Sequence, residues 1–91
     1  RSAPLAGLRN AINARLSELR GLTIFQGQTP IVSNAARGAI RNACGNPQTA
    51  NNVVYETPIS GHWRIFFAQG VSNGVVVLMV GHLNGNTLEQ P

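Results

Sequence analysis

The sequence predicts an α+β domain, with two N-terminal helices packed on one face of a C-terminal antiparallel meander of three to four strands. Two segments in the first half carry apolar residues at helical spacing. The second half holds two runs rich in aromatic and β-branched residues, joined by Ser72-Asn73-Gly74, which has the composition of a hairpin loop. With 91 residues the chain is long enough for a single domain with one modest core.

The first helix is expected over residues 4–20. Pro4 suits a first helical turn, and Gly21 follows the end. Residues at helical spacing form one apolar stripe, which consists of Leu5, Leu8, Ile12, Leu16 and Leu19. This stripe predicts that the helix packs on the sheet through a single face.

The second helix is expected over residues 30–44. Thr29 is a suitable N-cap and Pro30 a suitable first-turn residue, while Gly45 ends the segment. Arg37 and Arg41, four residues apart, are expected to project together from the exposed side of this helix. They are candidates for contacts with RNA, although a solvated helix face explains them equally well.

Three strands are expected over residues 53–57, 62–68 and 75–82. A three-residue loop ending at Gly74 would place Arg64 directly opposite His82. A turn over residues 58–61 would place Tyr55 opposite Arg64 and Thr57 opposite His62.

This register assigns the polar and the apolar residues to different faces of the sheet. One face would carry a candidate site, formed by Tyr55, Thr57, His62, Arg64, His82 and Asn84. The other face would be the core under both helices, formed by Val54, Trp63, Ile65, Phe67, Val77 and Met79. Glu56 falls on the helix-facing side, and a slip by one residue would bring it into the site.

The composition restricts the chemistry. The formal charge is +4, all seven cations are arginines, and the chain contains neither lysine nor aspartate. Six of the seven arginines lie at or before Arg41, so the first half is the basic half, which favours a polyanionic partner such as RNA. The lack of aspartate excludes a Ser-His-Asp triad, and three glutamates make a carboxylate metal cage improbable. We therefore expect no metal and no cofactor.

Imidazoles, a guanidinium, a phenol and a hydroxyl on one face suit metal-independent cleavage of RNA. This reaction needs a base for the 2′-OH, an acid for the leaving 5′-oxygen and a cation for the phosphorane. His82 and His62 can transfer protons near neutral pH, and Arg64 can bind two phosphate oxygens. Tyr55 and Thr57 complete the predicted catalytic set, with Asn84, Arg37 and Arg41 as substrate contacts. His62, His82, Tyr55 and Thr57 also fit ordinary structural or exposed positions, whereas Arg64 interrupts a strand that otherwise has the pattern of a core strand, where an unpaired charge would be costly.

The segment SGHWRIFFAQGVSNGVVVLMVGHLNGN resembles the final strands of the RelE-type ribonuclease toxins. Those proteins end in a strand of the form x-R-[LIV]-x-[YF], a turn, a valine-rich strand and a basic or histidine residue after it. Arg64 and His82 match these two positions. The resemblance implies that the arginine stabilises the phosphate during cleavage of mRNA on the ribosome, and that the histidine assists proton transfer. It also implies the helices and antiparallel sheet shared with barnase, EndoU and the tRNA-cleaving colicins.

The resemblance covers about the last 40 residues, and the first half departs from it. RelE-type chains are rich in lysine and begin with a strand, whereas this chain has no lysine and is predicted to begin with a helix. The difference favours a secreted or contact-delivered toxin domain that cleaves tRNA or another free RNA in a bacterial cytoplasm. Such a protein requires a cognate immunity or antitoxin partner. The chain begins at Arg1 without methionine, which is compatible with a C-terminal toxin fragment.

Two other functions compete with the ribonuclease. A non-catalytic module could use the same open sheet face to bind RNA or a protein. An ADP-ribosyl transferase or deaminase toxin is a weaker alternative, because it would need a catalytic glutamate or a zinc-ligand set that the sequence does not offer. Cys44 is expected to be structural, because a helix C-terminus disfavours a thiolate. No apolar run has the length of a membrane-spanning helix.

Overall fold

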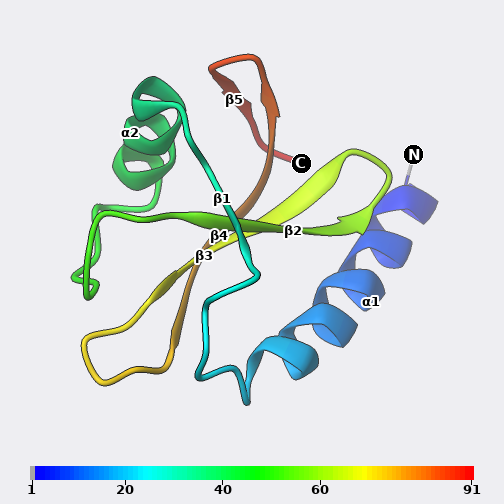
Figure 1. Ribbon diagram of the computed structural model, residues 1–91. Helices are drawn as coiled ribbons and strands as arrows, with labels where there is room; N and C mark the ends of the chain where they lie inside the picture. The colour runs from blue at the N-terminus through cyan, green and yellow to red at the C-terminus, as the bar shows by residue number, and fades with distance from the viewer. Residues whose placement is uncertain (1) are drawn as a thin grey trace.

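Residues 2–91 form two helices and a five-stranded antiparallel sheet. A computed structural model describes residues 2–91, with side chains from Gly7 onward. The elements in chain order are α1 (Ser2–Leu19), β1 (Thr29–Pro30), α2 (Asn34–Ala43), β2 (Tyr55–Ser60), β3 (Trp63–Gln69), β4 (Val75–Asn84) and β5 (Thr87–Glu89) (Figure 1). The strands are adjacent in the order of the chain. The predicted α+β class, with helices preceding an antiparallel meander, is confirmed, and the sheet has five strands where three to four were predicted.

Helix α1 follows the predicted apolar stripe. Leu8 and Leu19 are buried, and Ile12 and Leu16 are half-buried and pack against the core cluster that contains Leu19; the side chain of Leu5 lies outside the described part of the chain. Within residues 2–91, neither helix combines the length and the apolar character needed to cross a membrane.

Helix α2 begins four residues later than predicted. Its N-cap is Ser33, whose hydroxyl accepts a hydrogen bond from the Ala36 amide, rather than Thr29. Thr29 and Pro30 instead form β1, which pairs with the first two residues of β2. Thr29 and Ser33 are both suitable N-caps. Because Thr29 pairs with β2, the helix begins after Ser33.

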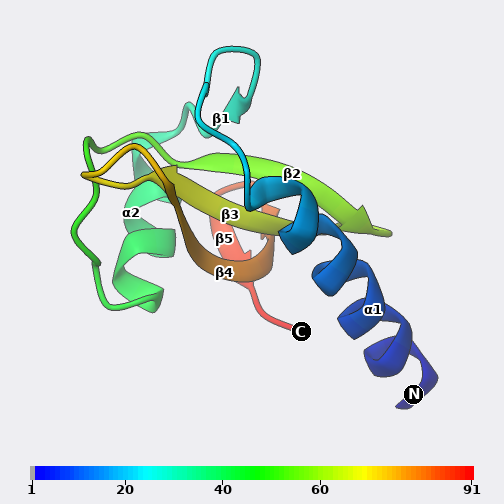
Figure 2. The same cartoon turned by 90° about the horizontal axis from the view of Figure 1, so that it is seen from below.

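The two helices cover opposite faces of the sheet, so the prediction of a single covered face is wrong. Phe66 packs with Ala36 and Ile40 of α2, whereas its neighbours Ile65 and Phe67 pack with Leu19 and other residues of α1. Figures 1 and 2 show the helices apart, with the strands between them. All four residues from Ile65 to Ala68 are fully buried. A continuous apolar run of this kind is typical of a strand that is covered on both sides.

Strand β2 extends through the segment that was predicted to be a turn. Arg64 lies opposite Pro58, and Tyr55 lies opposite Phe67, three residues away from the predicted register. Pro58 is tolerated because β1 pairs only with Tyr55 and Glu56, which leaves Pro58 at the edge of the sheet. The turn is formed by Gly61 and His62, with Gly61 at φ +59°.

The hairpin between β3 and β4 also differs from the predicted register. Its loop lies one residue earlier, with Asn73 rather than Gly74 in the left-handed conformation at φ +70°. The earlier loop moves the pairing by two residues, and a shift by two leaves the same side chains on each face of the sheet. The earlier loop by itself would place Arg64 opposite Val80, two residues from the predicted partner His82, and a β-bulge at Leu78 then moves the pairing back by one residue, so that Arg64 lies opposite Gly81. A shift by one residue reverses the face, and Arg64 and His82 therefore lie on opposite faces.

Candidate functional site: two histidines and a glutamate

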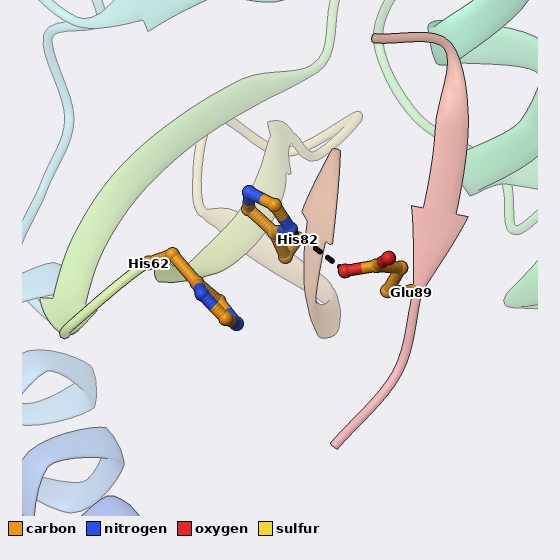
Figure 3. A group of neighbouring side chains, drawn as sticks. All are labelled: His62, His82 and Glu89. Carbon is orange, nitrogen blue, oxygen red and sulfur yellow. Dashed lines mark hydrogen bonds and ion pairs between the residues drawn. The ribbon is translucent and has the colours of Figure 1, made fainter. Parts of the chain in front are cut away.

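Three polar side chains meet at one end of the sheet, on the same face as α1. The ring of His62 lies 4.2 Å from the ring of His82, measured between centroids. Nδ1 of His82 lies 2.9 Å from Oε1 of Glu89. Figure 3 shows the His82 ring between the other two side chains. We refer to His62, His82 and Glu89 as the His–His–Glu cluster.

The register of the sheet places this cluster in one row across the strands. His82 and Glu89 are directly paired between β4 and β5. The β3–β4 register, continued by one residue from the Arg64–Gly81 pair, places Trp63 opposite His82, and the two rings meet edge to face with centroids 6.4 Å apart. The indole also packs against His62 at 4.6 Å. Trp63 thus supports both imidazoles from one side.

Arg64 holds the turn that carries His62. Its Nη1 donates to the carbonyl oxygen of Trp63 at 3.0 Å and to that of Gly61 at 3.4 Å, so its two acceptors flank His62. Nε lies 3.9 Å from a carboxylate oxygen of Glu56 on the α2 face. The predicted pairing of Arg64 with His82 on one face is wrong because of the β-bulge. Arg64 instead lies on the α2 face, where it contacts the backbone on both sides of His62 and not the His82 ring.

Strand β5, which carries Glu89, is fixed from the side of α2. Leu88 packs in the core cluster of α2, and alternation along the strand directs Glu89 to the other face. The Ser33 hydroxyl at the start of α2 donates to Oδ1 of Asn86 in the β4–β5 turn at 2.7 Å. This anchoring gives the exposed Glu89 a defined position next to His82.

Gly81 permits the close approach of β5 to β4, and we expect Gly81→Ala to disturb the cluster. A Cβ atom at this position would lie 2.9 Å from the carbonyl oxygen of Glu89 and 3.2 Å from a ring carbon of Phe66. The backbone of β5 would have to move, at a cost of about 1–3 kcal/mol. Urea denaturation measures this loss. Gly74→Ala is the matched control, since a Cβ atom at position 74 would have no neighbouring atom within 4 Å; equal stability of the two variants would contradict the close packing.

The hydrogen bond between His82 and Glu89 defines the chemistry of the His82 ring. An ionised carboxylate only accepts hydrogen bonds, so the Nδ1–H of His82 donates to Glu89. Nε2 is then left to accept or deliver a proton. Side-chain exposure is 27% for His82, and His62 is exposed, so the cluster is accessible from solvent.

Tyr55 and Thr57 are not part of the cluster. The Tyr55 ring packs against Phe25 and Phe67 in the core under α1, at centroid distances of 5.3 and 5.5 Å. Phe67, its partner in β3, lies four residues from Trp63, which corresponds to about 13 Å along the strand. Thr57 is paired with Ile65, two residues from Trp63, and is half-buried. The predicted pairing of Thr57 with His62 is wrong, because the turn lies at residues 61–62.

The predicted substrate contacts occupy two different places. Asn84 is exposed, two residues beyond His82 at the end of β4. Arg37 and Arg41 belong to α2 on the other face of the sheet and bind the chain itself. Arg37 donates to the carbonyl oxygen of Ile31 and to Asn34, and Arg41 donates to the hydroxyl of Thr49 and the carbonyl oxygen of Asn51. These arginines fasten the two loops that flank α2.

Glu89 is the one member of the cluster that was not predicted as a site residue, because β5 was not predicted. The signal was present in Gly85-Asn86, since Gly-Asn is one of the dipeptides that form two-residue hairpin loops. Gly85 has φ +65°, and Asn84 pairs with Thr87 across a two-residue loop. This hairpin returns the chain alongside β4 and brings Glu89 opposite His82.

Comparisons of the chain with protein-family models, with curated proteins and with solved structures find no match. The functional proposal therefore depends on the chemistry of the cluster and on the resemblance of the C-terminal strands.

Proposed function

We propose that this protein is an endoribonuclease that cleaves RNA through the His–His–Glu cluster, without a metal ion in the chemical step. The observation that carries the proposal is the contact between two imidazoles, one of which is oriented by a carboxylate. A base oriented by a second group is the usual arrangement for proton transfer in catalysis. The formal charge of +4 favours a polyanionic substrate.

In the proposed reaction His82 is the base and His62 the acid. Nε2 of His82 takes the proton of the ribose 2′-OH, and the O2′–P bond forms as the P–O5′ bond breaks. His62 delivers a proton to the leaving 5′-oxygen. The products are a 2′,3′-cyclic phosphate and a 5′-hydroxyl. Glu89 stabilises the imidazolium that forms on His82, which supports its assignment as the base.

Trp63 and Asn84 are proposed to bind the nucleotides beside the scissile phosphate. An indole next to the reacting groups can stack on a base, and such stacking is tolerant of sequence. Asn84 is exposed next to the cluster in β4 and can donate or accept hydrogen bonds. Arg37 and Arg41 contribute positive potential from the α2 face rather than a contact at the scissile bond.

The resemblance to RelE-type toxins suggests the biological setting of this activity. We propose a toxin that acts on tRNA, mRNA or another RNA in a bacterial cytoplasm and is neutralised by an immunity or antitoxin protein. If the target is mRNA, the resemblance to RelE-type toxins suggests that the mRNA is cleaved on the ribosome.

The experiment is incubation of the purified chain with total RNA in the presence of EDTA. We expect cleavage that EDTA does not suppress, because the proposed steps need only side chains of the protein. RNA that is bound but remains intact would contradict the enzyme and favour the non-catalytic RNA-binding module. Cleavage that requires an added metal ion would contradict the proposed mechanism.

A further inference from the structure

We propose that the His–His–Glu cluster binds one Zn²⁺ ion, with a ring nitrogen from His62, a ring nitrogen from His82 and a carboxylate oxygen of Glu89 as ligands. The three potential ligand atoms lie within 4.8 Å of one another. Two imidazoles and one carboxylate form a common ligand set for zinc, with water in the fourth position. This inference goes beyond the proposed ribonuclease and does not depend on it.

The geometry needs little change to accept the ion. Zinc bonds of about 2.0–2.1 Å in a tetrahedral site set the ligand atoms about 3.3 Å apart. The His82–Glu89 distance of 2.9 Å would open slightly, and His62 would move inward. His62 can do so because it is exposed on a turn, whereas β4 and β5 hold the other two ligands by direct pairing.

The ligand types favour a transition-metal ion such as Zn²⁺ over Mg²⁺. Imidazole nitrogen suits Zn²⁺ and Cu²⁺, while Mg²⁺ prefers an octahedral shell of oxygen atoms, most of them from water. The expectation of no metal was based on the lack of aspartate, which argues against an oxygen cage but not against a site with two nitrogen ligands. The three ligands come from a turn and two strands, so their spacing along the chain gave no zinc motif.

Zinc would also block the proposed proton transfer. An imidazole lone pair that binds a metal ion is not available to accept a proton, and the ion would displace the hydrogen bond between His82 and Glu89. If the ribonuclease proposal is correct, Zn²⁺ should inhibit cleavage in proportion to occupancy of the site.

The test is titration of the tag-free chain with Zn²⁺ in the absence of RNA, by calorimetry. We expect one ion per chain, and we expect His62→Ala, His82→Ala and Glu89→Gln each to weaken binding about 10-fold or more, since even substitutions outside the ligand shell cause losses of 10–100-fold. Mg²⁺ at the same concentration should not bind. Trp63, the only tryptophan, gives a second readout, because Cu²⁺ at the cluster should quench its fluorescence.

Matched controls separate this site from other metal ligands. The chain has only two histidines, one cysteine and three glutamates, so Cys44→Ser and Glu18→Gln cover the main alternatives outside the cluster and should leave zinc binding unchanged. No zinc binding by the folded chain, or full binding by a folded double variant His62→Ala/His82→Ala, would overturn the site. Zinc binding together with absence of RNA cleavage would support the metal site while the ribonuclease proposal fails.

Discussion

His82→Ala is expected to lower RNA cleavage about 10²-fold or more while the domain stays folded. The substitution removes the proposed base together with the hydrogen bond to Glu89, and one general acid–base group contributes a factor of about 10²–10⁴. The side chain is partly exposed and lies near the end of β4, so its loss should cost little stability. Initial rates on a labelled RNA, compared at equal concentrations of folded protein, measure the effect.

Two further variants make this experiment specific. Val77→Ala changes an exposed residue of the same strand, five residues before His82, and should cleave at the native rate. Glu89→Gln combined with His82→Ala should be little worse than His82→Ala alone, because groups that act as a unit are not additive. Native activity of folded His82→Ala protein would remove the cluster from the mechanism.

Phe66→Ala is expected to lower the free energy of unfolding by about 3–5 kcal/mol. The ring is fully buried and packs between the sheet and α2, so its removal leaves a cavity in addition to the lost transfer free energy. Domains of this size have about 5–15 kcal/mol of stability in total, so a large part would be lost. Urea denaturation measures the change.

Phe66→Ala tests whether α1 and α2 cover opposite faces of the sheet. If both helices lay on the face of Ile65 and Phe67, Phe66 would point to an open face, and its truncation would cost little. Ile24→Ala is the control, because Ile24 is 70% exposed and its loss should be small. A loss below about 1 kcal/mol for Phe66→Ala would contradict the packing of α2 on Phe66.

The sequence was sufficient to predict the fold class because its signals are local. Helical spacing in α1 and the β-rich segments of β3 and β4 are read within short windows, and these elements lie close to where they were expected. The position of α2 depended on a choice between Ser33 and Thr29 as N-cap, which pairing of β1 with β2 decides. Local patterns contain no information on such pairing.

Which residues meet in the site depends on how β2, β3 and β4 are aligned with one another, and the sequence did not determine this register. One unpredicted bulge at Leu78 separated Arg64 from His82, and the longer β2 moved Tyr55 into the core. His62 and His82 nevertheless lie together, because the turn at residues 61–62 lets the His62 ring reach the His82 ring, although His62 is not paired in a strand. The apolar run from Ile65 to Ala68 already indicated a strand covered on both faces, and this signal could have corrected the prediction of an open face.

The most direct test of the central proposal is cleavage of an RNA that carries a single 2′-deoxynucleotide at the mapped cleavage position, in the presence of EDTA. The 2′-hydroxyl is the proposed nucleophile, so we predict that this RNA stays intact at that position. The unmodified RNA should give a 2′,3′-cyclic phosphate and a 5′-hydroxyl. Cleavage of the deoxy-substituted RNA at the native rate, or products with a 5′-phosphate, would contradict proton transfer from the 2′-hydroxyl to His82.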